Sequence, residues 1–132
     1  MFIDTSVFVA ILSAEPDADE FATIIERAKV RLTSGLVLLE AAMRLSTKLD
    51  IDPLAVEIRL DAFLAEAQIS VIPITDAISR KAIAAFTKYG KGRGSKAQLN
   101  LADCLSYSCA KVHRAPLLFK GNDFTHTDID PA

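Results

Sequence analysis

Short apolar runs alternate along this chain with longer segments whose apolar residues recur every three or four positions. The short runs predict buried strands at residues 1–3, 30–33, 69–73 and 117–119. Strands that alternate with helices indicate a parallel sheet with helices on both faces. We therefore predict an α/β fold, with four to five short parallel strands flanked by helices in three layers (α/β/α).

Polar residues and prolines mark the expected helix starts. Thr5 and Ser6 can cap a short helix that reaches about Leu12. Further helices are expected from Pro16-Asp17, from about Gly35 to Lys48, from Pro53, from Thr75, and from Asn100 to about His113. The helix after Thr75 should present one apolar face, formed by Ile78, Ala82, Ala85, Phe86 and Tyr89.

Composition adds limits to this picture. The chain has 132 residues, 51% of them hydrophobic, which fits one domain over residues 1–132 with a sizeable core. A net charge of −2 argues against a protein that coats nucleic acid through its overall charge. The two cysteines, Cys104 and Cys109, lie five apart in a helical segment and are not expected to pair, which favours a cytoplasmic protein. We expect no secretory signal and no membrane span.

Four acidic residues stand where a parallel sheet places its functional sites, at the carboxyl ends of strands. Asp4 ends the first strand, and Asp123 follows the last. Asp103 lies in the first turn of a helix that follows a loop, and Glu40 lies within an earlier helix. Clustered carboxylates need a cation, and oxygen ligands suit Mg²⁺ or Mn²⁺, which can activate water for phosphodiester hydrolysis.

Three of these acids have a structural explanation as well. Asp103 can be an acid favoured by the helix dipole, with Asn100 as the helix cap, and this role can coexist with metal binding. Glu40 can pair with Arg44 one turn later. Asp123 can be a turn residue. Asp4, directly after a buried strand, more often marks a site.

A loop rich in glycine and basic residues occupies positions 90–97. Lys91, Arg93 and Lys96 could contact the backbone phosphates of a nucleic acid, and the glycines would let the main chain approach it. An equally good interpretation is that the loop is only a solvated connection between two helices.

Several segments together resemble the PIN domain family, and in particular the VapC toxins of prokaryotic toxin–antitoxin systems. The matching segments span nearly the whole chain in family order: Ile3-Asp4-Thr5-Ser6, Leu39-Glu40, residues 99–104 (LNLADC) and residues 117–124 (LLFKGNDF).

The resemblance implies a metal-dependent endoribonuclease with a PIN-like fold. Asp4 and Asp103 would hold Mg²⁺ or Mn²⁺, with Glu40 binding directly or through water, and Asp123 would complete the catalytic set. The supporting residues would be Thr5, Ser6, Asn100 and Asn122. Relatives commonly carry an acid where Asn122 stands, so the sequence leaves the choice of one or two metal ions open.

The same resemblance implies three partners: an RNA substrate, a VapB-type antitoxin whose tail would occupy the acidic cleft, and a second copy of the chain. Such a toxin would inhibit translation and growth. Transfer, ribosomal and messenger RNA all fit the sequence as substrates.

Two other classes share some of these features. A phosphoacceptor signalling module needs an acceptor Asp at the end of a central strand, whereas Asp50 and Asp52 lie between two helices and the third strand ends in Ile72-Pro73. A catalytically inactive PIN scaffold would not need four acids.

Overall fold

The computed structural model describes all residues, 1–132, as four strands and six helices. The strands are β1 (Phe2–Ile3), β2 (Leu32–Ser34), β3 (Ser70–Ile72) and β4 (Leu117–Leu118). The helices are α1 (Thr5–Leu12), α2 (Ala18–Arg27), α3 (Gly35–Leu49), α4 (Pro53–Glu66), α5 (Asp76–Tyr89) and α6 (Leu101–Val112).

The strands form one parallel sheet in the order β3-β2-β1-β4. Phe2 of β1 pairs with Leu32 on one side and with Leu117 on the other, so β1 is central. The Asp4 main-chain N–H donates to the Leu118 carbonyl at 3.0 Å. The carboxyl ends of β1 and β4 therefore lie side by side, and the segments that leave them start from one edge.

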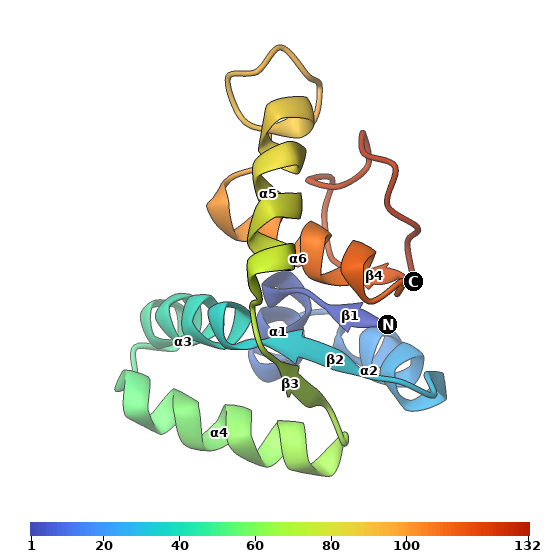
Figure 1. Cartoon of the computed structure of the whole chain (residues 1–132). Coiled ribbons are helices and arrows are strands. Elements are labelled where there is room, and N and C mark those ends of the chain that lie inside the picture. The colour runs from blue at the N-terminus through green and yellow to red at the C-terminus, as the bar shows by residue number, and fades with distance from the viewer.

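Helices cover both faces of the sheet, which confirms the predicted three-layer architecture. Figure 1 shows α4 on one side of the strands and the α5–α6 pair on the other. On the first side, the Phe8 ring of α1 meets the Phe63 ring of α4 edge-on, with centroids 5.8 Å apart. On the other side α5 packs against α6, where the Tyr89 and Tyr107 rings are 5.7 Å apart. None of the helices is both long and apolar enough to cross a bilayer.

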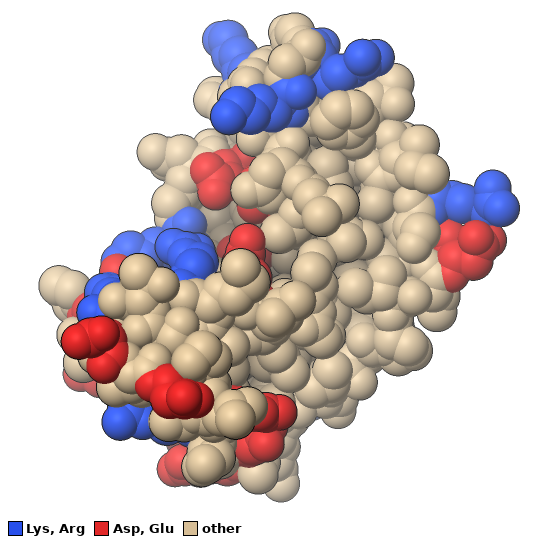
Figure 2. Space-filling view, turned by 90° about the vertical axis from the view of Figure 1, so that its left-hand side faces the viewer, with Lys and Arg blue, Asp and Glu red and all other residues tan.

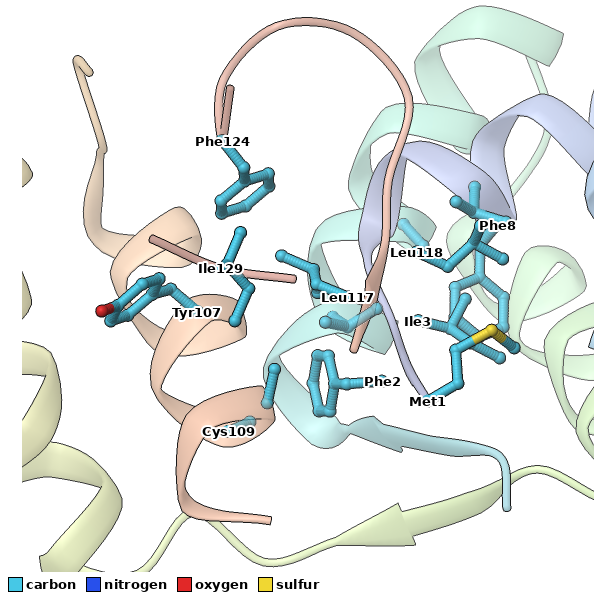
Figure 3. Close-up of a cluster of buried hydrophobic side chains, with 14 of the residues drawn as sticks. Met1, Phe2, Ile3, Phe8, Tyr107, Cys109, Leu117, Leu118, Phe124 and Ile129 are labelled. Carbon is cyan, nitrogen blue, oxygen red and sulfur yellow. The ribbon is translucent and has the colours of Figure 1, made fainter. Parts of the chain in front are cut away.

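The core joins the sheet to the last part of the chain. Phe2, Ile3 and Leu117 are fully buried, and Figure 3 shows Phe124 and Ile129 of the C-terminal segment beside Tyr107 of α6 and Leu117 of β4. The Tyr107 hydroxyl donates to Asp128 Oδ1 at 2.6 Å, which ties the same segment to α6. Burial and this bond fix the chain that follows β4, although it has no regular structure.

Most helix starts agree with the sequence. Pro53 is the first residue of α4, and the Thr75 hydroxyl caps α5. The cap of α1 was predicted wrongly: Asp4, not Thr5 or Ser6, is the N-cap, because its carboxylate accepts the Ser6 N–H. On the predicted apolar face of α5, Ile78, Ala82, Ala85 and Tyr89 are buried, whereas Phe86 is 45% exposed.

The second strand begins two residues later than predicted. Val30 lies before it and is 59% exposed. Leu32 pairs with Ser70 of β3, so the same register would put Val30 opposite Gln68. Gln68 has a φ of 52° in the turn after α4, and it cannot offer Val30 a strand partner.

Candidate active site

Asp4 stands where β1 gives way to α1, and the chain holds its carboxylate firmly. The side chain is buried, with 7% exposure. Its Oδ2 accepts the Ser6 main-chain N–H at 3.1 Å and the Ser6 hydroxyl at 2.7 Å. Ser6 Oγ in turn accepts the Lys120 main-chain N–H at 2.9 Å. The acid at the end of β1 is thereby connected to the segment that follows β4.

Asp103 is held by a capping box at the start of α6. Asn100 Oδ1 accepts the Asp103 N–H at 2.9 Å, and Asp103 Oδ2 accepts the Asn100 N–H at 3.1 Å. The side chain is 9% exposed. The structural role expected for Asp103 is therefore present, and it fixes the carboxylate in one orientation.

Both buried acids keep one carboxylate oxygen without a hydrogen bond. The caps use Oδ2 of Asp4 and Oδ2 of Asp103, and no protein donor reaches either Oδ1. Neither Oδ1 is among the fully buried atoms that lack a partner. Each acid therefore offers one solvent-accessible oxygen from a fixed position.

Glu40 and Asp123 approach Asp103 from other elements. Glu40 of α3 lines a shallow hollow together with Asn100, Leu101 and Ala102, the residues that lead into Asp103. It makes no ion pair with Arg44, the structural alternative that the sequence suggested. Asp123 lies on the exposed segment after β4. The carboxylates of Glu40 and Asp123 accept no hydrogen bond from the protein.

The electrostatics of Asp103 show that the four acids share one region. Burial raises the Asp103 pKa from its ordinary 3.8 to about 6, and the Asn100 N–H opposes this rise. The charges of Asp123, Asp4 and Glu40 raise the pKa further, with Asp123 contributing most of the three. The charges of the other three predicted acids therefore all reach Asp103.

The region is suited to a cation but is not a closed ligand cage. No three His, Cys, Asp or Glu side chains lie close enough together to form a ready-made metal site. Repulsion among carboxylates keeps such groups apart until a cation offsets their charge. An oxygen-only donor set with free Oδ1 atoms on Asp4 and Asp103 nevertheless fits Mg²⁺ or Mn²⁺.

The other predicted site residues take different places. Thr5 Oγ1 makes only a long contact, 3.5 Å, to the Val37 carbonyl. The Asn122 side chain makes no hydrogen bond, whereas its carbonyl accepts from the Thr125 N–H at 3.2 Å. Lys91, Arg93 and Lys96 are exposed on the loop between α5 and α6. Figure 1 places this loop at the top of the molecule, and Figure 2 shows a group of basic side chains there, with acidic side chains recessed below them.

Sequence reasoning missed Lys120. Its main-chain N–H supports Ser6, and its ammonium pairs with Glu15 and Asp17 at 3.0 Å each. These partners lie more than a hundred positions away. The only local signal was a basic residue directly after the apolar run of β4.

These features define a three-layer α/β protein with two buried aspartates, Asp4 and Asp103, as a candidate oxygen-only site. Residues 1–130 match the PIN domain family. Ribonuclease VapC28 of Mycobacterium tuberculosis is 42% identical over 132 residues, covering 100% of this chain and 97% of the relative. The chain therefore belongs to the PIN domain family, and within it to the VapC ribonucleases.

Solved structures share the fold. M. tuberculosis VapC20, described as a sarcin–ricin loop cleaving toxin, has a TM-score of 0.78 at 16% identity, over 99% of this chain and 97% of that one. A toxin–antitoxin complex from Klebsiella pneumoniae has a TM-score of 0.71 at 19% identity, over 96% and 92% of the two chains. At these identities the likeness concerns the fold.

Proposed function

We propose that this chain is one PIN-like nuclease domain that hydrolyses RNA phosphodiester bonds within the strand, with Mg²⁺ or Mn²⁺ as cofactor. The observation that carries the proposal is the pair of buried aspartates, Asp4 and Asp103, each held by one carboxylate oxygen with the other left free. The charges of Asp4, Glu40 and Asp123 all act on Asp103, which supports a shared site. The name of the M. tuberculosis relative, ribonuclease, supports the same reaction.

In this mechanism Asp4 and Asp103, each with one carboxylate oxygen free, would hold the cation, and Glu40 would bind it directly or through water. When bound, the cation lowers the pKa of water and offsets charge on the phosphoryl group. Ser6 and Asn100 keep the two aspartates oriented. Glu40 or Asp123 orients the attacking water and takes its proton.

No side-chain nucleophile and no 2′-hydroxyl takes part in this attack, so the products should carry 5′-phosphate and 3′-hydroxyl ends. The test is the purified protein on defined RNAs with Mg²⁺, Mn²⁺ or EDTA, alongside Asp4→Ala and Asp103→Ala. Cleavage that needs the metal and both aspartates supports the proposal. Products with 2′,3′-cyclic phosphate ends, or full activity in both variants, would refute it.

The loop between α5 and α6 is proposed as one RNA contact. Lys91, Arg93 and Lys96 are exposed, and Gly92 and Gly94 adopt φ values near +80° that shape the turn. Exposed cations on a turn can meet phosphates without first breaking a fixed structure. Charge reversal at Lys91 and Arg93 should weaken RNA binding; an unchanged affinity would leave the loop as a connection only.

We further propose that the protein is the toxin of a VapBC-type pair in the cytoplasm, inhibiting translation and growth, and that it forms a homodimer. The toxin–antitoxin complex from K. pneumoniae, which shares the fold, supports an antitoxin partner. An arginine from the antitoxin tail would suit the acidic region, because guanidinium binds carboxylates in a bidentate manner. Co-expression with the antitoxin should abolish both RNA cleavage and growth arrest.

A further inference from the structure

A second polar hollow opens on the side of Asp4 and Glu40. We call it the basic groove. The residues that line it include Ser6, Glu15, Met43, Arg44, Lys48 and Lys120. Its volume is about 620 Å³. Ser6 joins it to the acidic region, because the Ser6 hydroxyl that lines the groove donates to Asp4. Met43 lines both this groove and the hollow that contains Glu40.

The three cations of the groove are not equivalent. The Lys120 ammonium is held between Glu15 and Asp17, at 3.0 Å from each. The Lys48 ammonium lies 3.5 Å from Glu15 and donates to the Ser13 hydroxyl at 2.8 Å. The two lysines thus have carboxylate partners and brace the groove wall.

Arg44 is the cation with no acidic partner. It is exposed, lines the groove, and takes part in none of the ion pairs of the structure. It stands one helical turn after Glu40 on the same face of α3, yet the two side chains form no ion pair. An unpaired guanidinium in a hollow is suited to a planar or tetrahedral anion that it can bind with two donors.

An RNA strand supplies such an anion at a fixed spacing from the bond that is cut. If the scissile phosphate lies at Asp4 and Asp103, the strand must continue on both sides. Figure 2 shows basic side chains above the recessed acids and a second basic group beside them. One group belongs to the loop between α5 and α6, and the basic groove provides a cation on α3.

We propose that the basic groove binds the RNA phosphate next to the one that is cleaved, with Arg44 as the ligand and Lys48 beside it. This inference rests on the proposed ribonuclease function, whose scissile phosphate it takes as the reference point. Ser6, Glu15 and Lys120 act as positioning residues. Their contacts hold the groove wall against Asp4, so that a phosphate bound at Arg44 sets the register of the strand.

The test uses a short oligoribonucleotide with one cleavage site and a series in which a single linkage is a neutral methylphosphonate. Arg44→Gln is compared with Arg59→Gln, which removes a similarly exposed arginine from α4. Arg44→Gln should raise the KM about tenfold with little change in kcat, because a contact to a non-reacting phosphate binds ground and transition states alike. Arg59→Gln should behave like the parent.

The methylphosphonate series locates the contact. At one position beside the cleaved bond, a methylphosphonate linkage should raise the KM of the parent protein about as much as Arg44→Gln does. Combining that linkage with Arg44→Gln should raise the KM no further than either change alone. RNA binding in an Asp103→Asn background should show a log–log salt slope that is smaller by about 0.7 when Arg44 is removed, as for one lost phosphate contact on a single strand.

The possible outcomes distinguish a failure of the groove assignment from a failure of the proposed ribonuclease function. If the parent cleaves RNA but Arg44→Gln matches it in KM and in salt slope, the groove assignment is wrong and the ribonuclease stands. If no RNA is cleaved with Mg²⁺ or Mn²⁺, the proposed function fails, and the groove assignment with it. If Arg44→Gln binds RNA normally but loses its co-expressed antitoxin, the groove belongs to a protein partner and the inference is overturned.

Discussion

The four acids form two pairs that the chain holds in different ways. Asp4 and Asp103, the capped pair, are buried and accept hydrogen bonds from main-chain N–H groups at helix starts. Glu40 and Asp123, the uncapped pair, are more exposed and accept no hydrogen bond. The carboxylates of the capped pair are therefore fixed in orientation by hydrogen bonds, whereas those of the uncapped pair are not.

The difference shows how a short chain can build part of a site before any ligand arrives. A helix cap needs one oxygen, and a carboxylate has two, so the capped pair serves the fold and the site together. Burial without a cation makes the charged form of Asp103 costly, as its raised pKa shows. The uncapped pair is not confined by such bonds and can adjust to a cation and its water.

The largest expected effect separates the two roles of Asp4. Asp4→Asn keeps an oxygen for the Ser6 N–H and hydroxyl but removes the charge. We expect the rate of RNA cleavage to fall by about a thousandfold, since metal-assisted charge stabilisation is worth several kcal/mol. The free energy of unfolding in urea should stay close to that of the parent.

Asp4→Ala supplies the matched comparison. It should lose the same activity and about 1 kcal/mol of stability in addition, because the cap is removed. Single-turnover cleavage and urea unfolding on the same preparations measure both quantities. An Asp4→Asn protein that cleaves within tenfold of the parent would show that the charge at the end of β1 is not needed.

The uncapped pair should show the opposite pattern, with a smaller loss of activity and no loss of stability. Glu40→Gln and Asp123→Asn remove charges that no hydrogen bond supports. We expect cleavage to fall by about tenfold to a hundredfold, in the range typical of residues that act around a metal ion. A drop in unfolding free energy comparable with that of Asp4→Ala would contradict the division into two pairs.

The energetic cost of burying the Asp103 carboxylate can be tested without any metal. Burial, followed by the neighbouring charges, raises its pKa to about 6, above the 3.8 of an ordinary carboxyl. The folded protein thus binds this proton more tightly than the unfolded chain. The stability of the metal-free protein should fall as pH rises from about 4 to about 6, and stay lower above that.

Asp103→Asn removes this penalty while leaving an oxygen to accept the Asn100 N–H. In EDTA at pH 7 the variant should be more stable than the parent by on the order of 1 to 2 kcal/mol. At pH 4 the two proteins should be nearly equal. Urea unfolding at both pH values measures the difference, and a variant less stable than the parent at pH 7 would refute the assigned cost.

Much of the fold followed from local pattern. Apolar runs and helix caps such as Thr75 and Pro53 located the elements within a few residues. The start of β2 did not, because it depends on the register with β3 and on the turn at Gln68, which no periodicity encodes. The exposure of Phe86 likewise depends on how α5 meets α6.

The candidate site likewise has parts that the sequence predicts and parts that depend on the folded chain. The positions of Asp4 and Asp103 beside a strand end and a helix start could be recognised from the sequence, and so could the Asn100 cap. The effect of the Asp123 charge on Asp103 could not, because it requires the path of the segment after β4. The link from Lys120 to Ser6 joins residues 114 positions apart, and only the folded sheet edge brings them together.

The smallest expected effect concerns the uncapped pair, at the residue that precedes Asp123. Asn122 precedes Asp123 and has a free, exposed side chain, so Asn122→Asp adds a charge without disturbing a contact. We expect the Mg²⁺ concentration for half-maximal cleavage to fall two- to threefold, about what an exposed charge contributes. His126→Asp adds a charge farther along the same segment. An equal shift in this control would mean that net charge, and not a place beside Asp123, attracts the cation; a shift confined to Asn122→Asp would place residue 122 at the edge of the metal site.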